Sequence, residues 1–314
     1  MSASPRRTGN SRLSRNARNR TGALPSTERP NPSSAAIDAQ DITGILRTIQ
    51  KQDAGVPAAV KRQIPNIARA VEAVAKALRR GGRLIYVGAG ASGRIGMMDA
   101  AECPPTFGTA GEMVLAVMAG GSQALTRALE GSEDDRTQGR RDLAARKVGP
   151  HDVVVGLTAS GRTPYTLAAL GYARSRRAVT VAVTCNPGSP ATRAARIAIV
   201  PATGPEVVAG STRMKAALAQ KMVLHMISTA AMIRLGRVYR NYMVEVRPTN
   251  KKLLERARSI VAAVTGADRQ TAASTLERAG KDVKLAIVML QHGLDRAAAA
   301  KLLRRLRRDL RAIG

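Results

Sequence analysis

The sequence has very few aromatic residues and only two cysteines. Phe107 is its single phenylalanine, and there are five tyrosines and no tryptophan. The chain therefore has no aromatic-rich strand on which nucleic-acid bases could stack, as they do in RNA-recognition domains. Cys103 and Cys185 lie outside any C-x-x-C pattern, so we expect neither a disulfide scaffold nor a zinc site, and a reducing compartment fits.

Acidic residues are scarce relative to basic ones. The chain has 51 Lys and Arg against 22 Asp and Glu, which gives a net charge of +29. Positive charge of this size attracts phosphate backbones, but no zinc-finger spacing or other nucleic-acid motif accompanies it. The composition therefore indicates a soluble basic protein with weak attraction for anions, and nucleic acid is not its expected partner.

A long hydrophobic run is missing as well. The longest apolar stretch, Met222–Ile233, contains His225, Ser228 and Thr229, and it is too short to span a bilayer. The Arg-rich N-terminus has no apolar core, so it does not read as a secretory signal. We expect no membrane partner, and we interpret residues 1–30 as a disordered lead.

What the sequence does contain is an alternation of short apolar runs with helical stretches. The runs are Leu84–Val87, Met113–Met118, Val153–Leu157, Val179–Thr184 and, more weakly, Ile197–Pro201. Continuous apolar runs are typical of strands buried on both faces, and the helical stretches between them imply parallel crossovers. The sequence therefore predicts an α/β fold with a doubly wound, parallel five-stranded sheet flanked by helices.

Further helices are predicted before and after this sheet. Apolar residues at helical spacing predict helices at 42–49, at 64–78 up to Gly81-Gly82, and from Thr212 to about Leu235. The Ala-rich C-terminal region reads as helical, with breaks at Gly266, Gly280 and Gly293. We assign residues 31–248 to one domain around the sheet and residues 249–314 to a small C-terminal helical domain.

The loop after the first predicted strand carries a phosphate-binding pattern. Gly88, Gly90 and Gly93 form G-x-G-x-x-G between a strand and a helix, as in dinucleotide-binding proteins. Such proteins need an acidic residue after the second strand to hold the ribose, and here Ala119-Gly120-Gly121-Ser122 follows that strand. We therefore favour a monophosphate, held at the helix N-terminus by backbone amides and the Ser92 hydroxyl.

Two further loops offer hydroxyl groups and positive charge. Ser160-Gly161-Arg162-Thr163 follows the third strand and precedes Pro164, which suits the first turn of a helix. Ser211, Thr212 and Lys215 lie at the start of the predicted long helix. Serine and threonine also cap helices, so capping is the alternative role for any one loop. Three such loops together favour a sugar-phosphate site.

Three glutamates are candidate site residues. Glu102 shortly precedes Pro104, which predicts a helix end, and an acid in a last helical turn opposes the helix dipole at a cost of about 0.3–1 kcal/mol. Glu133 lies in the cluster Ser132–Asp135, whose spacing alone favours a capping box. One strand–helix step separates Glu102 from Glu133, so both are expected at one crevice. Glu206 is a weaker candidate, for which a structural role is equally open.

Eight sequence blocks in one order carry a family resemblance over roughly residues 27–295. They are Thr27-Glu28 to Ile37-Asp38, Gly81–Tyr86, Ser92-Gly93-Arg94, Glu102-Cys103-Pro104-Pro105, Glu130–Asp134, Ser160–Tyr165, Cys185–Ser189 and Gly210–Lys215. With them the chain resembles the N-acetylmuramic acid 6-phosphate etherases of the sugar-isomerase (SIS) superfamily. The resemblance implies a SIS-type catalytic domain in a homodimeric, cytoplasmic lyase of bacterial cell-wall sugar recycling, without metal or cofactor.

The resemblance also implies a reaction and two catalytic roles. Enzymes of this family cleave the D-lactyl ether of N-acetylmuramic acid 6-phosphate and release N-acetylglucosamine 6-phosphate and D-lactate. The acid that protonates the departing lactyl oxygen falls on Glu102, and the base for the C2 proton falls on Glu133. Ala91 stands where the family usually has threonine, so Ser92 must supply the phosphate hydroxyl there.

A non-catalytic sugar-phosphate-binding regulator is the alternative. Glucokinase regulatory proteins share the same signature without being etherases. The presence of both Glu102 and Glu133 argues for the enzyme.

Overall fold

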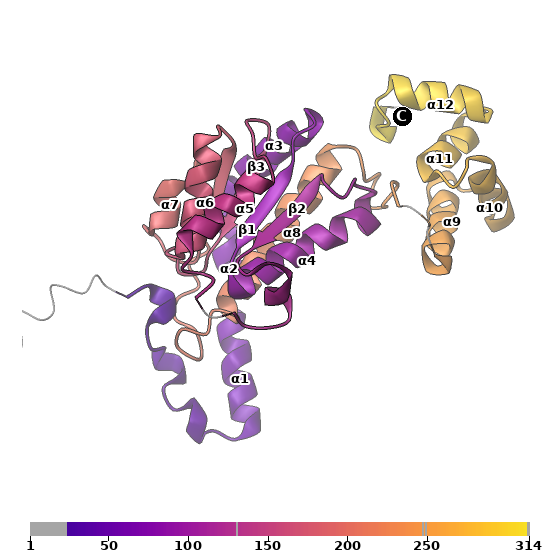
Figure 1. The fold of residues 1–314 in the computed structure, drawn as a ribbon. Coiled ribbons are helices and arrows are strands. Elements are labelled where there is room, and N and C mark those ends of the chain that lie inside the picture. The colour runs from indigo at the N-terminus through magenta and orange to yellow at the C-terminus, as the bar shows by residue number, and fades with distance from the viewer. Residues whose placement is uncertain (1–23, 130, 247, 249, 313–314) are drawn as a thin grey trace, which may run out of the picture.

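A parallel five-stranded sheet forms the centre of the protein (Figure 1). The computed structural model describes residues 24–129, 131–246, 248 and 250–312. The strands are β1 (Leu84–Gly88), β2 (Val114–Met118), β3 (Val153–Leu157), β4 (Val179–Val183) and β5 (Ile197–Ile199), in the order β2-β1-β3-β4-β5. Every predicted run is a strand and all neighbouring strands are parallel, which confirms the doubly wound fold.

Helices cover both faces of the sheet. The helices α3 (Ile64–Arg79), α4 (Gly90–Phe107) and α8 (Lys215–Arg234) pack on one face, and α5 (Arg136–Ala145), α6 (Pro164–Ser175) and α7 (Pro190–Ala194) pack on the other. Side chains alternate between the two cores along each strand: Leu84 and Tyr86 join the first, Ile85 and Val87 the second. Burial on both sides explains why the strands are continuously apolar.

The N-terminal segment stands partly away from the sheet (Figure 1). It contains the 3-10 turns η1 (Ser26–Glu28), η2 (Pro32–Ser34) and η3 (Ile37–Ala39), followed by α1 (Ile42–Asp53) and α2 (Val56–Lys61). The predicted helices at 42–49 and 64–78 are both present, but α1 buries none of its residues. Ile42 is 77% and Leu46 is 61% exposed, so an apolar stripe of α1 is uncovered in the single chain.

Part of the predicted lead is ordered. Residues 1–23 lie outside the described residues, whereas residues 24–30 are placed against the sheet domain. The Ser26 N–H donates to Asn186 Oδ1 at 2.6 Å, and Asn186 Nδ2 donates to the hydroxyl of the fully buried Thr27 at 3.0 Å. These long-range contacts join η1 to the loop after β4.

Helix α4 continues past both prolines, so the prediction that it ends before Pro104 is wrong. A proline in the last turns removes only its own N–H, which leaves one carbonyl four residues earlier without its helical donor. The helix instead ends at Phe107, where Gly108 has φ 61° and its N–H donates to the Pro104 carbonyl at 2.9 Å. Glu102 is therefore inside the helix, and the helix-dipole argument for it does not hold.

Helix α8 is long and apolar enough to cross a bilayer by length and composition. Half of the residues in its apolar segment are buried inside the protein. It packs against α3 and α4 and contributes Ala219, Val223, Ile227 and Met232 to the core on that face. This packing accounts for its apolar sequence. The predicted long helix is confirmed.

Four helices form the C-terminal part of the chain (Figure 1). They are α9 (Lys251–Thr265), α10 (Arg269–Arg278), α11 (Val283–His292) and α12 (Arg296–Arg305), followed by the 3-10 turn η5 (Leu310–Ala312). Gly266, Gly280 and Gly293 follow α9, α10 and α11 with positive φ, as predicted. The helices share a separate core, which also includes Val244 and Val246 from before residue 249.

Candidate functional site

A cavity of about 390 Å³ lies among the loops that follow β1 and β3. Its lining residues are Glu28, Ala89, Gly90, Ala91, Ser92, Glu133, Ala159, Ser160, Arg162, Thr163, Pro164, Gly210 and Thr212. The strand order reverses between β1 and β3, and open parallel sheets bind ligands at such a switch point. Seven of the predicted site residues meet here: Gly90, Ser92, Glu133, Ser160, Arg162, Thr163 and Thr212.

The first loop brings the N-terminus of α4 to the cavity. A Cβ atom on Gly93 would lie 2.9 Å from the Gly88 carbonyl oxygen and 2.7 Å from Met118 Cγ, so only glycine allows α4 to start this close to β1. The N-cap residue Ala89 makes no side-chain hydrogen bond. The first N–H groups of α4, including that of Ser92, therefore lack an intrahelical acceptor and favour an anion at this end.

The second loop is held in shape by its own hydroxyl groups. Thr163 Oγ1 and Thr158 Oγ1 are hydrogen bonded at 2.9 Å, and Ser160 Oγ accepts from the Arg162 N–H at 3.2 Å. The Gly161 N–H donates to Thr158 Oγ1 at 3.1 Å, so that N–H is already occupied, and Gly161 shapes the loop without lining the cavity. The predicted helix start after this loop is present, since α6 begins at residue 164.

Glu133 reaches the cavity because its backbone is attached to α6. The Tyr165 N–H, in the first turn of α6, donates to the Glu133 carbonyl at 2.9 Å. Asp135 is the N-cap of α5 and accepts from a backbone N–H of that helix at 2.8 Å. The expected capping therefore occurs through Asp135, whereas the Ser132 hydroxyl donates to the Leu129 carbonyl at 2.8 Å. Glu133 itself caps nothing with its side chain and lines the cavity.

Glu28 is a second carboxylate in the cavity, and the sequence analysis assigns it no individual role. The Gly210 N–H donates to the Thr27 carbonyl at 3.2 Å, which ties η1 to the loop before α8. A Cβ atom on Gly210 would lie 2.9 Å from Glu28 Oε2, so the two residues are in close contact. Thr27-Glu28 is one of the blocks that carry the family resemblance, but no spacing pattern connects it to residues so distant in the chain.

Glu102 does not join Glu133 within one chain, contrary to our expectation. It lies on α4, twelve residues after Gly90, which is about 18 Å along the helix axis. It is exposed. It lines neither this cavity nor a smaller one of about 210 Å³ that Glu133 also lines. The physical reason is that α4 is continuous, so it carries Glu102 from the carboxyl edge of the sheet back toward the amino edge.

Glu206 has a structural role in this conformation. It is fully buried, and its two carboxylate oxygens accept the N–H groups of Lys215 and Ala216 at 3.0 and 2.9 Å. Burial raises the pKa of Glu206 above its usual range even though these hydrogen bonds oppose the shift. Glu206 thus caps α8, and the alternative role of Ser211 and Thr212 as its caps is not found.

Lys215 also points away from the cavity. Its ammonium group donates to Gln52 Oε1 at 3.0 Å, between α8 and α1. Burial lowers the pKa of Lys215, while the nearby carboxylates of Glu206 and Asp53 oppose that change. Of the third predicted loop, only Thr212 and the neighbouring Gly210 line the cavity.

Family profiles and a solved structure are similar to parts of this chain. The family profile described as the N-terminal SIS domain of glucokinase regulatory protein matches residues 66–174, and the SIS domain profile matches residues 139–230. A phosphoheptose isomerase structure from Francisella tularensis is 18% identical, with a TM-score of 0.46 over 61% of this chain and 98% of that one.

Curated relatives are much closer in sequence. The N-acetylmuramic acid 6-phosphate etherase of Vibrio atlanticus (strain LGP32) is 50% identical over 269 residues, which are 86% of this chain and 88% of that protein. The etherase of Klebsiella aerogenes is 51% identical over 277 residues, which are 88% and 92% of the two chains. This chain belongs to the N-acetylmuramic acid 6-phosphate etherase family.

Proposed function

We propose that this protein is a carbon–oxygen lyase that cleaves the D-lactyl ether of N-acetylmuramic acid 6-phosphate to N-acetylglucosamine 6-phosphate and D-lactate. The observation that carries the proposal is one cavity in which the uncapped N-terminus of α4 lies beside the carboxylate of Glu133. The identity to the etherases supports the choice of substrate. Cys103 and Cys185 are free and buried, which fits our proposal of a cytoplasmic location.

The 6-phosphate binds at the helix N-termini of the cavity. The first turn of α4 offers backbone N–H groups and Ser92, and the loop before α6 offers Ser160, Arg162 and Thr163. Helix N-termini and a guanidinium together stabilise a phosphate dianion. This places the phosphate beside the two loops and leaves the sugar ring to extend toward Glu133.

The reaction is an elimination followed by a hydration. Ring opening exposes the C1 aldehyde, which makes the C2 hydrogen acidic. Glu133 removes the C2 proton, the electron pair forms the C2–C3 double bond, and the C3–O bond to lactate breaks as an acid protonates the leaving oxygen. Water then adds its oxygen to C3, and a proton returns to C2. A positioned general base or acid contributes about 10²–10⁴ to such a rate.

The acid is Glu102 of a second copy of the chain. Within one chain, Glu102 and the cavity lie at opposite ends of α4. Glu102 is on the solvent side of the helix layer α3–α8–α4, and that layer has an apolar groove of about 860 Å³ between α3 and α8. Pairing two copies through this layer covers the groove and brings the amino edge of one sheet toward the carboxyl edge of the other. We therefore propose a homodimer as the active form.

Isotope labelling tests the proposal, because it shows which products take up oxygen and hydrogen from water. The full chain is incubated with N-acetylmuramic acid 6-phosphate in H₂¹⁸O or in D₂O, and both products are analysed by mass spectrometry. Elimination and hydration place ¹⁸O at C3 and deuterium at C2 of the amino sugar, and D-lactate is released without ¹⁸O at its hydroxyl. Label in the lactate hydroxyl would mean that the other C–O bond breaks.

A sugar-phosphate-binding regulator is the second candidate. The match to the glucokinase regulatory protein profile and the absence of Glu102 from the single-chain cavity favour it. Binding of N-acetylmuramic acid 6-phosphate with no D-lactate release from the purified dimer would support this candidate and contradict the lyase.

A further inference from the structure

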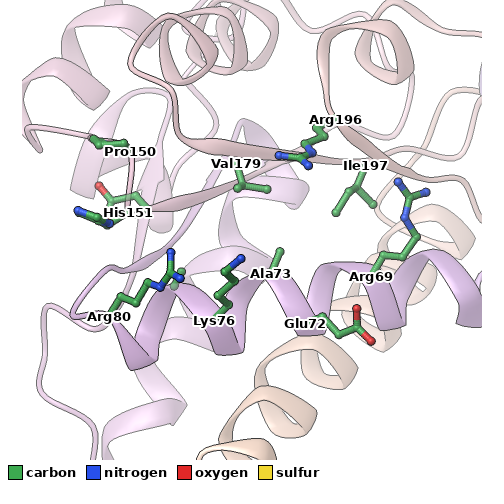
Figure 2. A pocket seen from close by; sticks show the side chains of 12 residues that line it. Arg69, Glu72, Ala73, Lys76, Arg80, Pro150, His151, Val179, Arg196 and Ile197 are labelled. Atoms are coloured by element: carbon green, nitrogen blue, oxygen red, sulfur yellow. The ribbon is translucent and has the colours of Figure 1, made fainter.

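A second concave site lies at the opposite end of the sheet from the candidate active site. It is a cavity of about 410 Å³ between one face of α3 and the amino ends of β4 and β5 (Figure 2). Its apolar floor includes Ala73, Val179 and Ile197. Four cationic side chains surround this floor: Arg69, Lys76, Arg80 and Arg196. Figure 2 shows Lys76 and Arg80 extending from α3 toward the facing loops.

The positive charge of this cavity is not balanced within the described part of the chain. There, none of the four cationic side chains forms a salt bridge. Two carboxylates also line the cavity, and one of them, Asp152, is neutralised by Arg83 at 2.7 Å. Glu72 is the other. Four cations against one unpaired carboxylate create a concave positive field, which concentrates anions.

Packing and hydrogen bonds hold the backbone around the cavity. A Cβ atom on Gly82 would lie 1.9 Å from the His151 carbonyl oxygen, so the turn before β3 packs directly on the start of β1. The Asp152 carboxylate accepts the Gly149 N–H at 3.0 Å, and the Arg196 N–H donates to Thr180 Oγ1 at 3.0 Å. The backbone contacts therefore keep the positions that carry the four cationic side chains around one hollow.

We propose that this cavity binds a small polyanion, carrying two or more negative charges on phosphate or carboxylate groups. Arginine and lysine groups are the side chains that pair with both kinds of anion. The volume of about 410 Å³ lies within the roughly 300–1,000 Å³ of small-molecule sites. A concave site with an apolar floor suits a compact ligand better than it suits the extended backbone of a nucleic acid.

The test is calorimetric titration of the full chain with pyrophosphate and with citrate at constant ionic strength. The pocket variant combines Arg80→Gln with Arg196→Gln, neither of which lines the groove between α3 and α8. The control combines Arg304→Gln with Arg305→Gln on α12, which removes equal charge elsewhere. We expect saturable binding to the wild type and the control, and binding at least about tenfold weaker in the pocket variant. Pyrophosphate and citrate together distinguish phosphate from carboxylate ligands.

Three outcomes would overturn the proposal. Equal weakening in the control would mean that net charge alone attracts the anion. Binding lost in Arg162→Gln and retained in the pocket variant would place the anion in the candidate active site. Binding of a single-stranded oligonucleotide that needs Arg80 and Arg196 but does not compete with pyrophosphate or citrate would identify a polymer surface. Release of D-lactate is expected to be unchanged in the pocket variant, which keeps this test independent of the proposed function.

Discussion

At the scale of single residues, backbone hydrogen bonds position the chemistry. Glu133 lies at the cavity because its carbonyl accepts the Tyr165 N–H. Its backbone thus holds it in place, and its carboxylate lines the cavity. Glu206, by contrast, uses both carboxylate oxygens to cap α8. Two glutamates that look alike in a sequence thus have different roles: Glu133 is held through its backbone carbonyl, whereas Glu206 uses its carboxylate as a helix cap.

The first prediction concerns Glu133→Gln. The amide cannot take the C2 proton, so we expect D-lactate release to fall by about 10²–10⁴. Binding of N-acetylglucosamine 6-phosphate, measured by calorimetry, should be retained. Asp134→Asn, next to it and also exposed, is the control and should keep full activity. Near-normal turnover in Glu133→Gln would remove it from the mechanism.

The second prediction concerns Asp152 and pH. Burial alone would raise the pKa of Asp152, but the hydrogen bonds from Arg83 and the backbone outweigh it, so the pKa lies below the ordinary 3.8. A lowered carboxyl pKa stabilises the fold above pH 3.8 and ceases to do so as the pH falls through the folded-state pKa. Asp152→Asn should therefore lower the free energy of unfolding by about 1.5–3 kcal/mol at pH 7.

Urea unfolding at several pH values checks this prediction. The difference between wild type and Asp152→Asn should shrink as the pH falls below 3.8. A difference that stays constant with pH would show that packing, and not the ion pair with Arg83, stabilises this turn.

At the scale of elements, α4 decides the layout of the site. Its N-terminus starts against β1 because Gly88 and Gly93 have no side chains between them. Its C-terminal half continues through Pro104 and Pro105 to Phe107. One helix therefore presents an anion site at one end and Glu102 toward the other.

The third prediction compares two glycines in helices. A Cβ atom on Gly93 meets Met118 and Gly88 at under 3 Å, whereas a Cβ atom on Gly171 in α6 meets nothing within 4 Å. Gly93→Ala should lower the free energy of unfolding by about 1–3 kcal/mol through overpacking. Gly171→Ala should raise it by about 0.5–1 kcal/mol, because alanine favours the helix. Thermal or urea unfolding measures both, and equal effects would contradict the close packing of α4.

At the scale of the whole molecule, a single chain leaves two features incomplete. The groove between α3 and α8 is apolar and open, and α1 exposes Ile42 and Leu46. The cavity with Glu133 lacks Glu102. If two copies pair through the layer of α3, α8 and α4, the second copy covers the groove and supplies Glu102 to the cavity.

The fourth prediction is that activity depends on this pairing. Ala230→Glu places a charge in the groove lined by α3 and α8 and should give a monomer that releases D-lactate at least about 10²-fold more slowly, since it lacks the acid. Analytical ultracentrifugation and circular dichroism measure the oligomer and the fold. A folded, fully active monomer would contradict the proposed dimer.

The fifth prediction uses mixed dimers. Glu102→Gln and Glu133→Gln should each be inactive alone, and refolding them together should restore up to about a quarter of the wild-type rate, because a mixed dimer has one intact site if each site takes residues from both copies. Recovery would support Glu102 from the second copy. Absence of recovery would mean that both glutamates are needed in one chain, and full activity of Glu102→Gln alone would leave Glu28, the other carboxylate of the same cavity, as the acid.

Much of the fold and part of the site could be predicted from local patterns. Apolar runs predicted all five strands, and glycines predicted where α3, α9, α10 and α11 end. Loops after parallel strands predicted seven residues of the cavity. The prediction failed at Pro104, where a steric preference of one residue was outweighed by the rest of a long helix. Local spacing also did not identify Glu206 as the residue that caps α8.

The sequence by itself determined the strands, their parallel order of connection and the loops that carry phosphate-binding groups. Those properties depend on side-chain periodicity and on turns, which are local. Only the tertiary structure decided that Glu28 joins the cavity, that Glu102 does not, and that Arg69, Lys76, Arg80 and Arg196 surround one hollow. These placements depend on how long a helix is and on which distant segments pack together. The spacing of nearby residues predicts neither.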